Sequence, residues 1–173
     1  PSRKIKPSSA IFRISKYNLA PVLYSIFSSL YVPLKYITLS YKLSNIWESF
    51  RECSSLIYCI APGATVTNYA FTSCKLLTYV YIPNVTRLES GTFQSCLSLR
   101  SVVIPSTVSY LGGLLFDGCG IRSLKFEGTT PPSVGGSIYL PLSCIIYVPE
   151  ESLDLYKSTA NMPTPSSYLY VGY

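Results

Sequence analysis

Six cysteines are the residues of this chain best suited to nucleophilic or metal chemistry, and four recur 21 to 23 residues apart, at Cys53, Cys74, Cys96 and Cys119. The sequence contains no histidine, which removes the partner base of a Ser-His or Cys-His nucleophile and the commonest metal ligand. It has no Cys-x-x-Cys pair either, which disfavours a zinc site. We therefore predict no catalytic residue, no metal ligand and no cofactor.

The regular cysteine spacing favours a structural role. Equivalent residues of stacked coils lie about 4.8 Å apart, a Cα–Cα distance that a disulfide could span. Their Cβ atoms point in parallel directions, however, which is incompatible with the dihedral angle that a disulfide requires. We therefore expect a ladder of buried free thiols that fill space. We expect Cys59 at an inward strand position and Cys144 at the start of the last strand.

The acidic and glycine clusters also have structural interpretations. Glu150, Glu151 and Asp154 follow a proline and are expected to open a C-terminal helix, where carboxylates favour the helix N-terminus. The glycine pairs at 112–113 and 135–136 are expected to form turns, because no phosphate-binding Lys-Ser/Thr partner accompanies them. The sequence offers no motif for acid–base or phosphate chemistry.

A repeat of about 22 residues positions the cysteines. The segment from Phe71 to Pro83 matches the segment from Phe93 to Pro105, and the same frame recurs from Phe50 and, one residue shorter, from Phe116. Its Leu-x-x-Val-x-Ile stretch alternates with period two, which predicts a strand with one inward face, and the proline that follows ends that strand. One coil cannot bury its own apolar face, whereas a stack of coils can.

The first third of the chain fits the same frame with weaker matches. The expected strand-leading positions are separated by 21 to 23 residues, at Ile11, Leu34, Leu56, Leu77, Leu99, Ile121 and Ser143. This register explains the uncharged tract 17–34 as one coil, although its length raises the question of a membrane-spanning segment. We predict no such segment. The predicted architecture is a stack of about seven coils over 11–149, after a basic segment at 1–10 and before a cap with a short helix and tail at 150–173.

Basic residues gather in residues 1–50, which hold seven lysines and arginines against one acid and so carry the whole net charge of +6. A basic end can contact nucleic acid or anionic lipid. The chain has no arginine-rich cluster and no aromatic RNA-binding signature, so we interpret this end as solvated and predict no nucleic-acid partner.

Tyrosine, present sixteen times, occupies many outward positions of the predicted strands. Tyr36, Tyr58 and Tyr79 hold one position in three consecutive coils and are expected to form a column, with Tyr81 beside it. Tyrosine offers contact area and a hydroxyl for protein or sugar recognition, but an aromatic ladder can equally serve to stabilise a sheet. Both interpretations stay open. The candidate ligand-binding residues on this face are Tyr36, Tyr58, Tyr79, Tyr81, Lys125 and Tyr147.

The repeat resembles the BspA-type leucine-rich repeat, which reads roughly Phe-x-x-Cys-x-x-Leu-x-x-Ile-x-Ile-Pro-x-x-Val-x-x-Ile-Gly. The best match runs from Phe93 to Gly112, and residues 126–157 are similar to the family's usual ending. The match is degenerate over 11–49, where Leu30 stands in place of cysteine and Ser40 in place of proline. The resemblance implies a right-handed solenoid with short parallel strands on one face and loops and short helical turns on the other. It implies no enzyme activity.

The same resemblance supplies the functional expectation. Members of the family are mainly exported, surface-displayed proteins linked to adhesion and to binding of matrix proteins or other cells. We therefore expect an extracellular or cell-surface module whose sheet face binds a protein partner or a host matrix component. A carbohydrate-binding surface domain and a purely structural spacer remain as alternatives.

Overall fold

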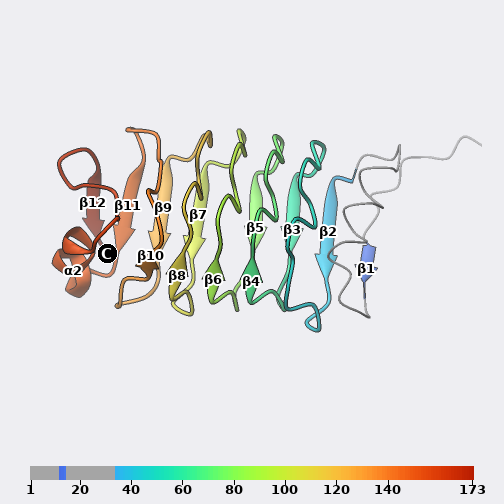
Figure 1. Cartoon of the computed structure of the whole chain (residues 1–173), viewed down its shortest axis with the longest axis horizontal. Coiled ribbons are helices and arrows are strands. Elements are labelled where there is room, and N and C mark those ends of the chain that lie inside the picture. Colours follow the sequence, from blue (N-terminus) through green and yellow to red (C-terminus); the bar gives the residue numbers. More distant parts are fainter. Residues whose placement is uncertain (1–11, 15–33) are drawn as a thin grey trace, which may run out of the picture.

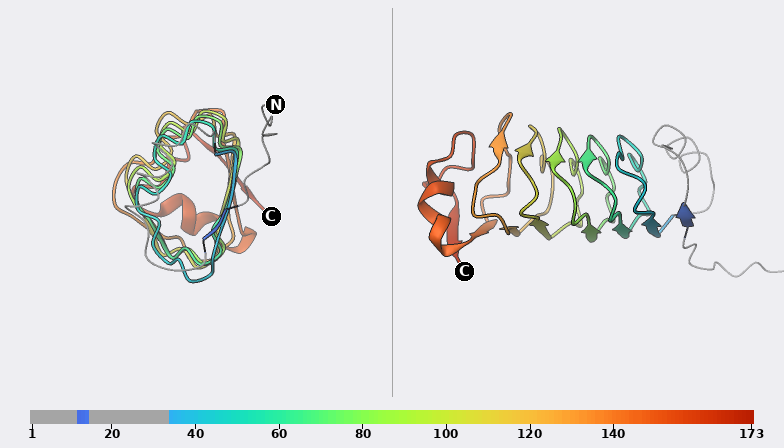
Figure 2. Two further views of the ribbon diagram at one scale, coloured as in Figure 1. Left: turned by 90° about the vertical axis from the view of Figure 1, so that its right-hand side faces the viewer. Right: turned by 90° about the horizontal axis from the view of Figure 1, so that it is seen from below.

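The computed structural model describes residues 12–14 and 34–173 and forms a parallel-strand solenoid of about six turns (Figure 1). Successive coils superpose when the stack is seen end on (Figure 2). The basic segment 1–10 and residues 17–33 of the uncharged tract lie outside the described residues. A first row of strands comprises β1 (Phe12–Ile14), β2 (Tyr36–Leu39), β3 (Tyr58–Ile60), β5 (Tyr79–Tyr81), β7 (Ser101–Ile104), β9 (Ser123–Phe126), β11 (Ile145–Val148) and β12 (Leu169–Gly172).

The first-row strands pair in parallel because every coil returns to this face in the same direction. Tyr36 lies opposite Tyr58, and Tyr58 opposite Tyr79, so the pairing register reproduces the repeat spacing. The row forms two four-stranded sheets, β1-β2-β3-β5 and β7-β9-β11-β12. The inward-facing repeat pattern is the same on both sides of this division and predicts a continuous row.

Alternation along each first-row strand directs every second side chain into the core. Ile37, Val102, Leu124 and Ile146 are buried at equivalent positions, and Cys59 occupies the inward position expected for it, opposite Val80. Burying an aliphatic side chain of this size stabilises the fold by about 1.5–3 kcal/mol. Val80, on β5, is the exception because it is only half-buried.

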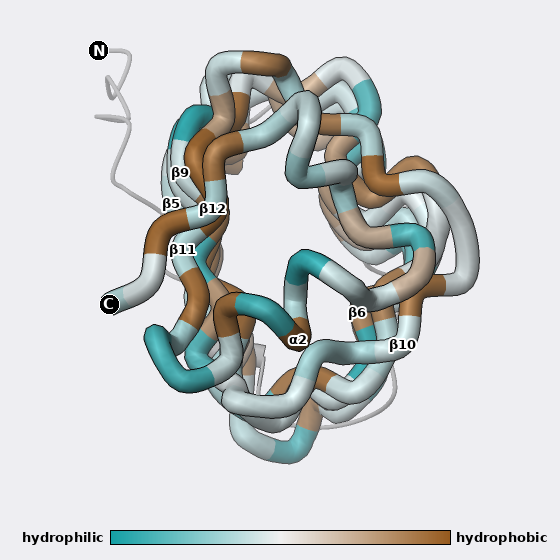
Figure 3. Tube along the Cα trace, turned by 90° about the vertical axis from the view of Figure 1, so that its left-hand side faces the viewer, coloured by the Kyte–Doolittle hydropathy of each residue, from teal (hydrophilic) through white to brown (hydrophobic). Residues whose placement is uncertain are grey.

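A second row of strands lies on the other side of each coil (Figure 3), where the sequence leads us to expect only loops and short helical turns. Its four members pair in parallel in one unbroken sheet: β4 (Val66–Thr67), β6 (Arg87–Leu88), β8 (Tyr110–Leu111) and β10 (Ser133–Val134). The expected helical turns are single hydrogen-bonded turns, in which the cysteine N–H donates to the phenylalanine carbonyl three residues earlier. Two-residue strands are too short for a period-two pattern to reveal them.

Phenylalanine and cysteine ladders join the coils along the stacking axis. The rings of Phe50, Phe71, Phe93 and Phe116 stack with centroids 5.6–5.7 Å apart. The thiols of three repeat cysteines donate to the phenylalanine carbonyl of the preceding coil at 2.7–3.1 Å, as Cys96 Sγ does to the carbonyl oxygen of Phe71. The six cysteines are free thiols, and their regular spacing thus reflects a repeated contact between coils.

The C-terminal end of the stack is covered by a short helical segment, η1 (Glu150–Ser152) followed by α2 (Leu153–Ser158), which lies across the end of the coils (Figure 3). Tyr156 of α2 packs against Phe126, and its hydroxyl donates to the carbonyl oxygen of Gly128 at 2.8 Å. Within the segment predicted as a cap, β12 adds a parallel strand beside β11. No helix in the described part of the chain has the length and apolar character needed to cross a bilayer.

Candidate functional site: a tyrosine-lined groove

The outward face of the first row carries a column of tyrosines. The rings of Tyr58 and Tyr79 stack with centroids 4.6 Å apart and planes 13° apart, and Tyr36 stands next to Tyr58 in register. Such an aromatic pair contributes about 0.5–1.5 kcal/mol beyond its buried area. Tyr36 and Tyr79 remain 41% and 44% exposed. The column therefore stabilises the sheet and also offers aromatic surface to solvent.

The column ends at Tyr79, because the next coil has Ser101 at the same repeat position. One ring face of Tyr79 is stacked on Tyr58, and the face toward β7 meets no ring in the described part of the chain. Tyr81, the other outward residue of β5, lies opposite Ile60 and is 46% exposed. Two tyrosines of one strand thus border the place where the sheet divides.

The division is confined to the first row. The second-row strands β6 and β8 stay paired at this level of the stack, with Arg87 opposite Tyr110. The turn between the rows also stays joined, since Gly91 N–H donates to the carbonyl oxygen of Gly113 at 3.1 Å. The two coils are therefore held together along their other sides and separate only between β5 and β7. The half-burial of Val80 agrees with this local opening.

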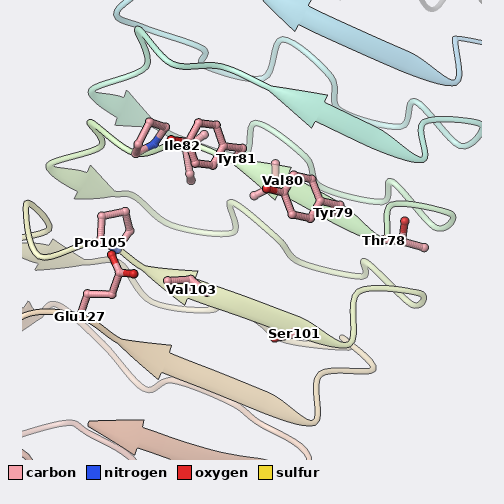
Figure 4. Close-up of a pocket in the computed structure, with 10 residues that line it drawn as sticks. Thr78, Tyr79, Val80, Tyr81, Ile82, Ser101, Val103, Pro105 and Glu127 are labelled. Carbon is pink, nitrogen blue, oxygen red and sulfur yellow. The ribbon is translucent and has the colours of Figure 1, made fainter. Parts of the chain in front are cut away.

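A groove of about 430 Å³ follows the division between β5 and β7 (Figure 4). Tyr79 and Tyr81 line it from β5, and Ser101 and Val103 from β7. Its end near the carboxyl termini of the strands is lined by Pro83, Pro105 and Glu127. The volume falls at the low end of the range of ligand pockets, ~300–1,000 Å³. The groove combines apolar and aromatic walls with one carboxylate.

Glu127 is the single charged residue among those that line the groove. Its carboxylate is exposed, and no ion pair within residues 34–173 involves it. Lys125, the cation of the adjacent strand β9, is engaged elsewhere, because its ammonium lies 3.8 Å from the ring centroid of Tyr173. The Glu127 carboxylate is therefore open to a ligand.

The six predicted site residues fall into two groups. Tyr79 and Tyr81 line the groove, and Tyr58 and Tyr36 continue the same face through β3 and β2. Lys125 and Tyr147 face each other on β9 and β11, beyond the division and toward the C-terminal end. The structure thus brings four of the candidates together with the groove and leaves the other two outside it.

Sequence reasoning did not single out Val103, Pro105 and Glu127 as site residues. A signal was present in the outward row, which reads Tyr36, Tyr58, Tyr79, Ser101 along four consecutive coils and so changes from large to small between Tyr79 and Ser101. Where equivalent side chains stack from coil to coil, a small residue after a run of large ones leaves a hollow in the outward face.

Outside the groove, the charge of Arg87 is engaged and the thiol of Cys74 is unreactive. Arg87 Nε donates to Glu89 Oε1 at 2.6 Å, and its guanidinium lies 4.0 Å from the Tyr110 ring centroid. Burial raises the pKa of the Cys74 thiol well above its ordinary value, which opposes thiolate chemistry. Within residues 12–14 and 34–173, no group of three or more cysteine and acidic residues could hold a metal ion.

Comparison with known families identifies a repeat family that covers much of the chain. The family described as "BspA type Leucine rich repeat region" matches residues 22–132 in six copies, which is more than half of the chain. Among the curated proteins, none matches this sequence.

Solved structures of bacterial leucine-rich-repeat proteins share the fold. The pneumococcal vaccine antigen PcpA superposes with a TM-score of 0.62 at 17% identity over 83% of this chain and 43% of its own. A leucine-rich-repeat protein of Bacteroides ovatus superposes with a TM-score of 0.50 at 16% identity, over 83% of this chain and 35% of its own. A leucine rich cell surface protein of Faecalibacterium prausnitzii superposes with a TM-score of 0.50 at 20% identity, over 75% of this chain and 39% of its own. The chain thus spans less than half the length of each of these proteins.

Proposed function

This chain belongs to the BspA-type leucine-rich-repeat family, and on that basis we propose that it is a non-enzymatic interaction module of an extracellular or surface-attached protein. Its ligand is a protein, either a matrix component or a cell-surface partner, bound through the outward face of the first strand row. The shared fold with a leucine rich cell surface protein of Faecalibacterium prausnitzii supports this location.

The observation that carries the proposal is the gathering of exposed tyrosines beside a groove. Solenoids bind partners along the continuous surfaces that their stacking creates. Tyrosine is enriched at the energetically dominant positions of protein interfaces, because it buries a large area at a small cost in side-chain entropy. Tyr79 and Tyr81 are both about half exposed and line the groove between β5 and β7.

Ring stacking favours a protein ligand over a glycan on the column itself. A sugar packs its C–H groups onto an open aromatic face, whereas the facing surfaces of Tyr58 and Tyr79 cover each other at 4.6 Å, and the open face of Tyr79 belongs to the groove. Their edges and hydroxyls remain for contact, which suits the mixed apolar and hydrogen-bonding surface of a protein. A glycan ligand is therefore the competing outcome of the binding test.

A solid-phase screen of the purified chain against extracellular-matrix proteins and a glycan panel tests the proposal. The variant Tyr58→Ala/Tyr79→Ala/Tyr81→Ala removes the aromatic surface, and Tyr110→Ala, a tyrosine of the second row, serves as the matched control. We expect saturable binding to a protein that survives high salt, falls at least tenfold in the triple variant and persists in the control, since losing about 1.4 kcal/mol gives a factor of ten.

Three other results would contradict this function. Saturable binding to glycans alone would assign the face to carbohydrate. Binding that disappears in high salt and is the same in the triple variant would identify a nonspecific charge effect. Absence of binding across the screen would move the spacer interpretation to first place.

A further inference from the structure

The groove between β5 and β7 carries a more specific inference about the partner, and it rests on the function proposed above. Its middle is aromatic and apolar, Thr78 and Ser101 place hydroxyls at one end, and the only charge among the lining residues lies at the other end, where Glu127 is next to Pro105 (Figure 4). A ligand that fits this arrangement has an extended apolar part and one terminal charge.

The charge of that ligand follows from the carboxylate. An acidic group would be repelled by Glu127, an apolar group would displace water without replacing its hydrogen bonds, and a neutral donor would bond the carboxylate without the charge attraction that a cation adds. No basic side chain is among the described residues that line the groove, so nothing in its lining offsets this preference. Charge complementarity selects a cation.

The aromatic walls select the same ligand. A guanidinium or ammonium group is attracted to the face of a tyrosine ring within about 6 Å of the ring centroid. Tyr79 has a ring face toward β7 that no ring of the described residues covers, and Tyr81 stands on the same strand nearer the carboxylate end. Arginine and lysine carry an aliphatic stem that packs along apolar surface while the charged head reaches a polar end.

We propose that this groove receives one arginine or lysine side chain of the protein partner, with the stem against Tyr79, Tyr81 and Val103 and the cationic head at Glu127. The site resembles a small specificity pocket within a broader interface: the tyrosine column supplies area, and the groove selects the partner residue. Arginine is the preferred occupant, because its planar guanidinium both stacks on an aromatic ring and pairs with a carboxylate through two N–H donors.

The test uses blocked single residues as probes. N-acetyl-arginine methylamide is titrated into ¹⁵N-labelled protein, and NMR follows the chemical shifts of the backbone amides of Val80 and Val103. A parallel titration uses N-acetyl-citrulline methylamide, a neutral analogue of nearly the same shape. We expect saturable shifts with the arginine probe and none with the citrulline probe over the same concentrations.

Variants assign the effect to the groove. Glu127→Gln is expected to weaken the arginine probe by about tenfold, whereas Glu151→Gln, an exposed acid of the cap, leaves its affinity unchanged. Ser101→Tyr places a ring where the column stops and is expected to block the groove. Because Glu127 and Ser101 are exposed, both variants should fold, and thermal unfolding checks this.

Each remaining outcome is decisive. Equal shifts from the arginine and citrulline probes, or arginine binding that is unchanged in both Glu127→Gln and Ser101→Tyr, would overturn the inference. If a matrix protein binds through the tyrosines but does not respond to Glu127→Gln, the proposed function stands and the cation pocket falls. If the arginine probe binds as expected while the screen finds no protein ligand, the pocket stands and the proposed function falls.

Discussion

At the scale of single residues, each coil with a stacked phenylalanine contains two backbone positions in the left-handed conformation. Positive φ recurs two residues before and two residues after each stacked phenylalanine, at Glu48, Glu52, Tyr69, Ser73, Gly91, Ser95, Leu114 and Gly118. Only two of these eight residues are glycine, although the left-handed region costs other residues about 1–2 kcal/mol. The tight turn that directs each phenylalanine inward is thus maintained by packing between coils.

Gly91 gives a direct test of this strain. Its φ is +61°, and an added Cβ would collide with the ring of Tyr69 in the preceding coil. We expect Gly91→Ala to lower the free energy of unfolding by about 1–3 kcal/mol, measured by urea denaturation. Gly113→Ala is the matched control, because its φ is not positive and its Cβ would meet nothing closer than 3.6 Å. Equal losses in the two variants would contradict this account.

At the scale of strands, the division between β5 and β7 leaves backbone groups without ladder partners. Tyr79 N–H donates to Ile57 on the β3 side, so alternation directs Val80 N–H toward β7, where no strand pairing is present. We expect the amides of Val80 and Val103 to exchange with solvent at least about tenfold faster than that of Leu124, after correction for intrinsic rates. Leu124 lies in β9, which is paired on both sides. Hydrogen exchange followed by NMR makes the comparison, and equal protection would show that the sheet closes in solution.

The first row of strands could be predicted from the sequence, whereas the second row and the groove could not. Strands of the first row follow from the Leu-x-x-Val-x-Ile pattern, because a strand with one buried face alternates in period two. The register of the tyrosine column follows from the repeat length alone. The second row was missed because a pair such as Val66–Thr67 carries no readable period. The groove was missed because it arises from how far two coils separate, which depends on packing across the stack.

At the scale of the whole molecule, stability is distributed along the stack, since each coil contacts mainly its neighbours. The C-terminal end is closed by side chains that reach back over long sequence distances. Tyr173 donates its hydroxyl to the carbonyl oxygen of Phe126 at 2.8 Å, and Tyr168 donates to Leu140 at 2.8 Å. These bonds tie the cap to the last coils and protect their apolar interior from water.

The buried thiols and phenols that fill this stack make the stability of the whole chain sensitive to alkaline pH. Burial raises the pKa of both Cys53 and Cys144 from 9.0 to about 11, and it raises the pKa of Tyr156 and Tyr170 above the usual 10.0. These groups lose protons at lower pH in the unfolded chain than in the folded one. Between pH 9 and 11 the unfolded state therefore binds fewer protons, so the free energy of unfolding falls as pH rises.

Urea denaturation at pH 7, 8, 9, 10 and 10.5 measures this dependence. We expect these thiols to add no slope well below pH 9 and a progressive loss of stability above it. In Cys53→Ala/Cys144→Ala the chain is less stable at pH 7 because one half-buried and one buried side chain are shortened. The slope above pH 9 is smaller because two titrating groups are gone. Stability that stays constant to pH 10.5, or an identical slope in the variant, would show that ionisation of these thiols does not limit the fold.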